Sequence, residues 1–188
     1  MKLFLSPHND DETLFGAFTI MRESPMVVVV YDGYVQRNRG ATKFSNFERR
    51  HETNFALAQL GHPGAKFLGM RDDAASMPED VVFRLRAVID VDQKFETVYA
   101  PLYDLDGHEQ HNIVALAASC LDADKIIRYS TYTRSGGRQV TANEVTPTDG
   151  GMIARKHRAL ACYMSQLDMD PRLGCWPWFM GDLKEYIA

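Results

Sequence analysis

Residues 3–17, LFLSPHNDDETLFGA, combine the two kinds of element from which the rest of the chain is built. Residues 2–5, of which the last three are apolar, predict a short buried strand, and residues 13–22 carry apolar side chains at helical spacing. The polar segment between them holds four charged or titratable residues: His8, Asp10, Asp11 and Glu12. Carboxylates so close together repel one another, so a simple turn would favour Gly, Asn or Ser. We therefore expect a cation at this turn.

Strands and helices alternate along the chain beyond this stretch. The clearest strand is residues 26–31, a continuous β-branched run typical of a strand buried on both faces. The other predicted strands are residues 65–68, 97–101 and 125–131, and the other predicted helices are residues 45–60, 79–89, 112–123 and 152–167. This alternation predicts an α/β fold of three layers, Rossmann-like, with helices flanking a mostly parallel sheet. Ligands of such folds bind at the carboxyl ends of the strands.

Composition sets limits on the function. The 188 residues are 45% apolar, which suits one domain (1–188) with a real core. The net charge of -4 and the absence of long basic runs argue against nucleic-acid binding. No apolar run is long enough to span a bilayer, and the N-terminus does not resemble a signal peptide. Cys120, Cys162 and Cys175 fit neither a disulfide framework nor a metal pattern, so we expect reduced thiols and a cytoplasmic location.

A second polar cluster, HEQH at residues 108–111, follows the strand predicted at 97–101. Because both clusters follow strands of one parallel sheet, they are expected to meet at its carboxyl edge. Catalytic zinc sites use three His, Asp or Glu ligands and leave one position for water, and His8, Asp11 and His111 would supply such a set. Asp10 would then be placed to take a proton from the water. His108 would donate a proton or stabilise a developing oxyanion.

Simpler interpretations of both clusters stay open. Asp11 or Glu12 could cap the helix that starts near Thr13, which would leave His8 as a turn residue. A His-x-x-His pair also occurs often on solvated loops.

The motifs SPHNDDE and HEQH resemble those of the PIG-L/LmbE family of zinc-dependent N-acetylglucosaminyl de-N-acetylases. Four further segments resemble the family in the same order along the chain: YDG at 31–33, RRHETNFALAQLG at 49–61, FLGMRDD at 67–73 and KHRALACYMSQL at 156–167. The resemblance implies one Zn²⁺ per chain, held by His8, Asp11 and His111. It likewise implies Asp10 as general base, His108 as the acid or oxyanion-stabilising histidine, and Arg49 and Asp72 as substrate contacts.

The implied reaction is hydrolysis of the acetamide of an N-acetylated amino sugar conjugate, a small-molecule substrate, by metal-activated water. Two positions depart from the family pattern: Asn9 stands for the usual Pro, and Gln110 for the usual Asp. A neutral Gln110 cannot stabilise a protonated His108 as a carboxylate would, so a weakened or inactive family member that binds metal or sugar is the alternative. Residues 34–45 and 133–150 are expected to select the substrate.

Two other classes of function fit the sequence less well. A phosphohydrolase with Mg²⁺ or Mn²⁺ would prefer oxygen ligands, whereas two histidines favour zinc or another transition metal. A nucleotide-binding protein would be expected to carry a GxGxxG or GxxxxGK[ST] motif, and the chain has neither. Composition leaves homo-oligomerisation open. Trp176 and Trp178 are expected to form a packing patch near the C-terminus.

Overall fold

A computed structural model describes residues 1–32, 45–72, 75–90, 94–133, 143–167 and 183–188. The strands are β1 (Lys2–His8), β2 (Met26–Tyr31), β3 (Ala65–Phe67), β4 (Phe95–Pro101), β5 (Ala123–Tyr129), β6 (Asn143–Glu144) and β7 (Tyr186–Ile187). The helices are α1 (Asp11–Glu23), α2 (Asn46–Gln59), α3 (Pro78–Arg86), α4 (Glu109–Ala118), α5 (Gly150–Leu160) and α6 (Met164–Leu167). Most of the two segments expected to select the substrate, together with Cys175, Trp176 and Trp178, lies outside these ranges.

The sheet has the order β3-β2-β1-β4-β5-β7-β6. The first five strands are parallel, and β7 runs antiparallel to both β5 and β6. The chain moves from β1 outward to β3, then returns to the other side of β1 and continues from β4 to β5. Because the direction of winding reverses there, a crevice is expected at the carboxyl ends of β1 and β4. The predicted α/β fold with a mostly parallel sheet is confirmed.

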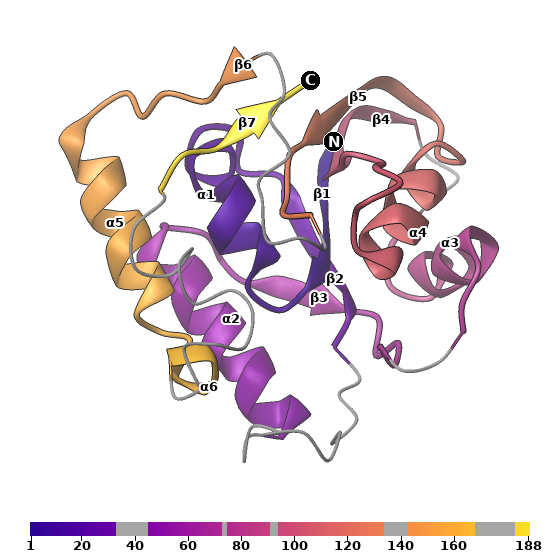
Figure 1. Ribbon diagram of the computed structural model, residues 1–188, viewed down its shortest axis with the longest axis horizontal. Helices are drawn as coiled ribbons and strands as arrows, with labels where there is room; N and C mark the ends of the chain where they lie inside the picture. The colour runs from indigo at the N-terminus through magenta and orange to yellow at the C-terminus, as the bar shows by residue number, and fades with distance from the viewer. Residues whose placement is uncertain (33–44, 73–74, 91–93, 134–142, 168–182) are drawn as a thin grey trace.

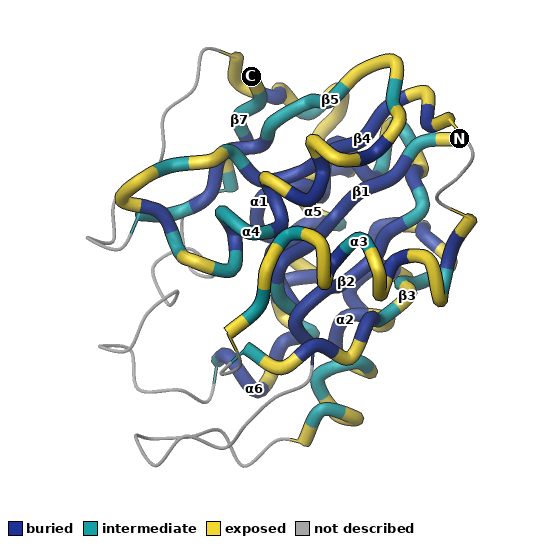
Figure 2. The backbone as a smooth tube through the Cα atoms, turned by 90° about the vertical axis from the view of Figure 1, so that its right-hand side faces the viewer, coloured by how far each residue is buried: buried dark blue, intermediate teal, exposed yellow. Residues whose placement is uncertain are grey.

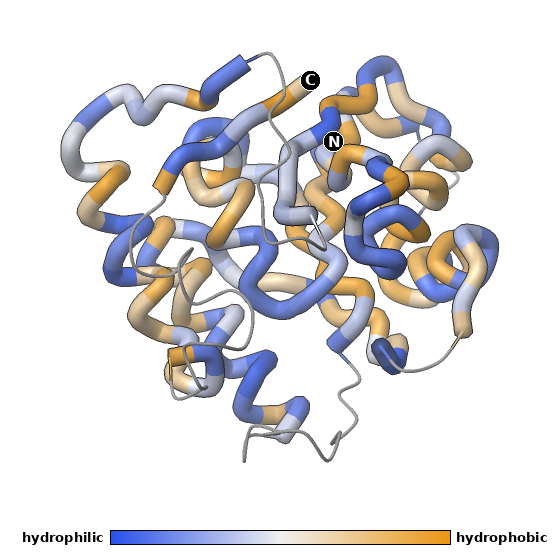
Figure 3. The backbone as a smooth tube through the Cα atoms, in the orientation of Figure 1, coloured by the Kyte–Doolittle hydropathy of each residue, from blue (hydrophilic) through white to orange (hydrophobic). Residues whose placement is uncertain are grey.

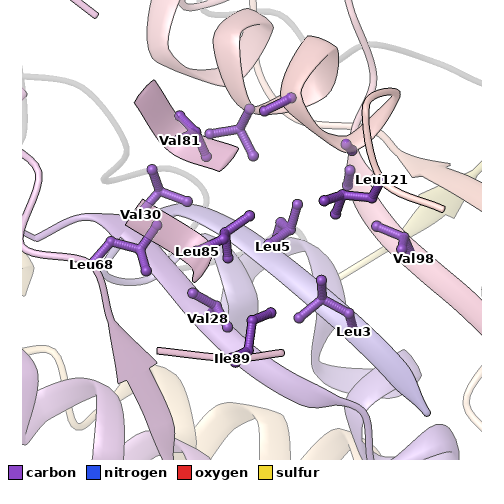
Figure 4. Close-up of a cluster of buried hydrophobic side chains, with 14 of the residues drawn as sticks. Leu3, Leu5, Val28, Val30, Leu68, Val81, Leu85, Ile89, Val98 and Leu121 are labelled. Atoms are coloured by element: carbon purple, nitrogen blue, oxygen red, sulfur yellow. The ribbon is translucent and has the colours of Figure 1, made fainter. Parts of the chain in front are cut away.

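Helices cover both faces of this sheet. In Figure 1, α1, α2 and α5 lie on one side, and α3 and α4 lie on the other. The face toward α3 and α4 carries a cluster of buried aliphatic side chains, shown in Figure 4, from β1, β2, α3 and β4. The opposite face packs Phe4, Tyr99 and Tyr129 against α1 and α5. The two apolar cores hold the central strands fixed, and with them the residues at the strand ends.

The turn from β1 into α1 is hydrophilic yet buried. Figure 3 shows a hydrophilic segment where β1 passes into α1, and Figure 2 shows the central strands buried along most of their length. Asn9, Asp10, Asp11 and Glu12 are all less than a tenth exposed. Buried carboxylates are costly unless they are paired, so this turn must find its partners inside the protein.

Close packing of α1 on β1 depends on Gly16. A Cβ added there would lie 2.2 Å from Cζ of Phe4, whose ring is fully buried and stacks on Tyr129 at a centroid distance of 4.8 Å. Glycine therefore lets the helix approach the strand closely enough to place its first turn beside the end of β1.

Several element boundaries differ from the sequence-based expectation. The helix predicted at 112–123 is α4, which starts at Glu109 and ends at Ala118, so His111 lies in a helical turn rather than in a loop. The last helix, predicted as continuous over 152–167, ends at Leu160, and α6 follows after a turn. The strands β6 and β7 were not predicted.

No helix within the described ranges is long and apolar enough to cross a membrane. Cys120 and Cys162 are free thiols, as expected. The single-domain organisation and the cytoplasmic location stay predictions.

Candidate metal centre and active site

The two polar clusters meet at the carboxyl ends of β1 and β4. His8 is the last residue of β1, and Asp11 is the first residue of α1. His108 precedes α4 directly, and His111 lies in the first turn of that helix. The expectation that both clusters share one edge of the sheet is therefore correct, although 103 residues separate His8 from His111.

Three of these side chains form a small triangle. Nδ1 of His8 lies 3.3 Å from Oδ2 of Asp11 and 3.2 Å from Nε2 of His111, and the third side, from Nε2 of His111 to Oδ2 of Asp11, is 3.1 Å. Ligands 2.0–2.1 Å from a tetrahedral zinc ion lie about 3.3–3.4 Å apart, which is the edge of the tetrahedron. The triangle thus has nearly the size of one face of a tetrahedral zinc site.

Two further observations show that a cation fits this donor set. Oδ1 of Asp11 is buried and has no hydrogen-bond partner within the described residues. Nδ1 of His111 lies 3.0 Å from Oγ1 of Thr131, so an Nδ1–H that donates to Thr131 leaves the lone pair of Nε2 directed at the triangle. Metal-bound histidines commonly make such a bond with their other nitrogen.

His108 lies beside the triangle. Ligand atoms of His8, His108 and His111 all lie within 4.8 Å of one another, which makes a wider set of three that could also hold a metal. We favour the triangle with Asp11, because its edges match tetrahedral coordination and because a carboxylate offsets the charge of the ion. The His108 ring meets the His8 ring edge to face at a centroid distance of 5.2 Å. The His108 ring therefore lies directly beside the place where the triangle could hold an ion.

Electrostatics separate the two neighbouring aspartates. Burial raises the pKa of the Asp10 carboxyl well above its ordinary value, and the charge of Arg49 only partly opposes this effect. Burial by itself would raise the pKa of the Asp11 carboxyl as well. The charge of His111 and hydrogen bonds from His111 and His8 outweigh this effect, so the pKa of Asp11 is lowered. The two adjacent carboxyl groups therefore differ in their affinity for a proton, which is higher at Asp10 than at Asp11.

Asp10 has an unusual backbone. Its φ of 114° and ψ of -32° lie in a region that residues with a side chain rarely adopt. Strain of this kind costs about 1–3 kcal/mol and persists only where the surroundings enforce it. The position of Asp10 is therefore determined by its neighbours rather than by local preference.

Glu12, whose task the sequence left open, supports this turn. Its Oε2 accepts hydrogen bonds from Ser6 Oγ at 3.2 Å and from the backbone N–H of Asp10 at 3.1 Å. Its Oε1 accepts the hydroxyls of Thr13 and Tyr163. Glu12 thus fixes the chain around Asp10 and stays outside the triangle.

Arg49 and Asp72, the two predicted substrate contacts, lie at the edges of this site. Nη2 of Arg49 donates to the backbone oxygen of Asn9 at 2.5 Å and lies 3.3 Å from Oδ2 of Asp10. Gln110 turns its amide to the backbone oxygen of Asp72, with a bond of 2.6 Å, and Oδ1 of Asp72 is buried with no hydrogen-bond partner among the described residues. Both roles in substrate binding stay predictions.

Sequence reasoning missed several residues that build the site. Thr131, Tyr163 and Thr53 come from segments far away in sequence, and each contacts the site through a hydroxyl. Thr53 and Tyr163 lie in two of the segments that resemble the family. Thr53 also lies four residues after Arg49 on α2 and so shares its helix face. Threonine and tyrosine hydroxyls otherwise look like ordinary core or surface groups in a sequence.

The fold and the site together define an α/β protein with a mostly parallel sheet, whose carboxyl edge carries a cluster of histidine and aspartate side chains that could hold a metal ion. A model of the PIG-L family, GlcNAc-PI de-N-acetylase, matches residues 3–121, more than half of the chain. All the predicted site residues fall within this match. The chain belongs to the PIG-L family.

Solved structures with the same fold include enzymes of more than one kind. N,N'-diacetylchitobiose deacetylase from Pyrococcus horikoshii is 20% identical, with a TM-score of 0.66 over 88% of this chain and 70% of that one. GalB, the 4-carboxy-2-hydroxymuconate hydratase from Pseudomonas putida, is 18% identical, with a TM-score of 0.66 over 95% of this chain and 83% of that one. The zinc-inhibited form of teicoplanin deacetylase Orf2 is 14% identical, with a TM-score of 0.63 over 88% and 84%. No curated protein sequence matches the chain.

Proposed function

We propose that this protein is a zinc-dependent N-deacetylase that hydrolyses the acetamide of an N-acetylated amino sugar conjugate and releases acetate and a free amine. The observation that carries the proposal is the triangle of His8, Asp11 and His111, with sides of 3.1–3.3 Å, next to the buried carboxylate of Asp10. Membership of a de-N-acetylase family supports the same reaction.

Each residue has a distinct task in this proposal. His8, Asp11 and His111 would hold one zinc ion per chain, and zinc lowers the pKa of a bound water to about 7 and polarises carbonyl oxygens. Asp10 would take the proton from the attacking water, since burial raises its pKa and makes it a stronger base than an exposed aspartate. His108 would protonate the departing amine or stabilise the oxyanion. Arg49 would keep the Asp10 carboxylate in place and contact the substrate, and Asp72 would offer its buried oxygen to a sugar hydroxyl.

Gln110 is the residue that favours the alternative, a binding module without catalytic activity. Its amide is bonded to the backbone of Asp72. No carboxylate at position 110 therefore supports a positive charge on His108. The buried Asp10 with its arginine partner favours catalysis, because a protein that only binds metal or sugar has no need of a base beside the ligands.

Replacing Asp10 with Asn tests the proposal most simply. The variant should bind as much zinc as the wild type, because Asp10 lies outside the triangle, but its kcat should fall about 10²–10⁴-fold. Acetate release from N-acetylglucosamine and N,N'-diacetylchitobiose measures activity, and elemental mass spectrometry measures zinc. Asp122→Asn is a matched control, because Asp122 is an exposed residue immediately before β5, at the opposite end of the sheet.

Two results would contradict this assignment. Undiminished turnover in Asp10→Asn would remove Asp10 from the role of base. Absence of acetate release by zinc-loaded wild type, from these and other N-acetylated sugars, would favour the binding module.

A further inference from the structure

The peptide between Asn9 and Asp10 is held at both of its polar atoms. Its carbonyl oxygen accepts Nη2 of Arg49 at 2.5 Å, and its N–H donates to Oε2 of Glu12 at 3.1 Å. Rotation of this peptide would break both bonds and would move the Asp10 carboxylate. The two bonds therefore hold the unusual backbone conformation of Asp10, which is unfavourable by itself.

The Asn9 side chain adds a third attachment. Its Oδ1 accepts the hydroxyl of Thr53 at 2.9 Å, and both residues are buried, Asn9 at 4% and Thr53 at 0% exposure. Thr53 lies one helical turn after Arg49, so one face of α2 holds both the backbone and the side chain of Asn9.

Helix α2 is itself anchored firmly enough to serve as a support. Arg50 forms an ion pair with Asp32 at the end of β2. The Glu52 carboxylate accepts the backbone N–H of Ser165 at 2.7 Å and its hydroxyl at 2.5 Å. Contacts on two sides thus fix the helix against the sheet and against α6.

We propose that Asn9 and Thr53 are positioning residues whose hydrogen bond holds the Asn9–Asp10 peptide, and so the Asp10 carboxylate, in the orientation needed for proton transfer. The inference rests on the proposed function, in which Asp10 is the base. In this chain, the hydrogen bond between Asn9 and Thr53 restricts the backbone at position 9, as the ring of a proline at that position would. Proline fixes its own φ and favours an extended residue before it, and His8 is already extended at the end of β1.

A double-variant design tests this role. Thr53→Val removes the hydroxyl with little change in shape and should lower kcat about tenfold or more, with KM changed less than about twofold and zinc content unchanged. Asn9→Pro combined with Thr53→Val should recover most of the kcat, because the ring restores rigidity and neither buried partner is left unsatisfied. Thr53→Ser keeps the hydroxyl and should behave like the wild type.

Hydrogen exchange of the Asp10 amide gives a readout that does not depend on activity. This N–H should exchange about tenfold faster in Thr53→Val than in the wild type and should return to the slow rate in the double variant. Thr97→Val is the matched control, because Thr97 is a buried threonine within β4, away from the carboxyl edge of the sheet. In Thr97→Val, the exchange rate of the Asp10 amide and the kcat should equal those of the wild type.

The outcomes separate the two claims. Equal Asp10 exchange in Thr53→Val and Thr97→Val would overturn the positioning role, and so would a double variant that exchanges as fast as Thr53→Val. If Thr53→Val does not fold, slow exchange in the folded double variant supports the role and fast exchange overturns it. If the exchange rates follow the prediction while the zinc-loaded wild type deacetylates none of the sugars, the positioning of the Asn9–Asp10 peptide by Thr53 is supported and the proposed function fails.

Discussion

Replacing Lys156 with methionine tests the buried ion pair that ties the C-terminal strand to α1. Its ammonium donates to Glu185 Oε1 at 2.7 Å, to the backbone oxygen of Leu14 at 2.8 Å and to that of Leu183 at 3.1 Å. Glu185 accepts the backbone N–H of Phe18, and both charged side chains have 0% exposure. The pair thus bonds the carbonyl of Leu14 and the N–H of Phe18, two groups one turn apart in α1.

The expected loss follows from this burial. Lys156→Met leaves the Glu185 carboxylate without its counter-charge, and removing one partner of a buried pair costs about 3–5 kcal/mol. For a chain of this length, about 2–4 °C of melting temperature corresponds to 1 kcal/mol, so a drop of about 6–20 °C is expected. Lys156→Met with Glu185→Gln should lose only about 1–2 kcal/mol, because a neutral amide still accepts the N–H of Phe18.

Urea unfolding at a fixed zinc concentration measures these free energies, since ligand binding would otherwise shift them. Lys184→Met is the matched control: its side chain is 59% exposed and lies 3.5 Å from Glu144, so the loss should stay below about 1 kcal/mol. A loss below 1 kcal/mol for Lys156→Met, or losses that simply add in the double variant, would refute the reasoning.

Two further predictions concern stability. Burial lowers the pKa of His62, whose Nε2–H donates to Pro25 O at 2.8 Å, so the unfolded chain binds a proton first as the pH falls below about 6.5. Unfolding free energy should therefore decrease below that pH, and His62→Asn should remove part of the decrease in urea titrations at pH 7.5 and 5.5. Gly16→Ala should cost about 1–3 kcal/mol through its clash with Phe4, while Gly150→Ala, with open space at the added Cβ, should not destabilise the protein.

The sequence predicts those helices and strands whose own residues carry a strong local pattern. The apolar run at 26–31 forms β2. The helix predicted at 45–60 is α2, and the side chains of Ser45 and Glu48 form a capping box at its start. The strands β6 and β7 were missed because each has only two residues. The pairing of β7 with β5 is formed by backbone hydrogen bonds to a segment more than 50 residues away in the sequence. Such strands depend on tertiary contacts rather than on a pattern of their own.

The candidate site was predictable to a similar extent. Strand order brings His8, Asp11 and His111 to one edge, so the triangle follows from motif and topology together. The hydrogen bonds around the triangle cannot be predicted in this way. The bond from Thr53 to Asn9, for example, joins residues 44 positions apart and depends on how α2 packs. The sequence shows that Asn9 stands where the family usually has Pro, but it does not show that the Asn9 side chain is bonded to a buried hydroxyl.

Metal content tests the central claim most directly. Wild-type protein purified without chelator should contain about one zinc per chain by elemental mass spectrometry, and His8→Ala combined with His111→Ala should contain almost none. His157→Ala, which removes an exposed histidine of α5, should keep the wild-type amount. A wild-type protein that carries no metal and takes up none from added zinc would contradict the account.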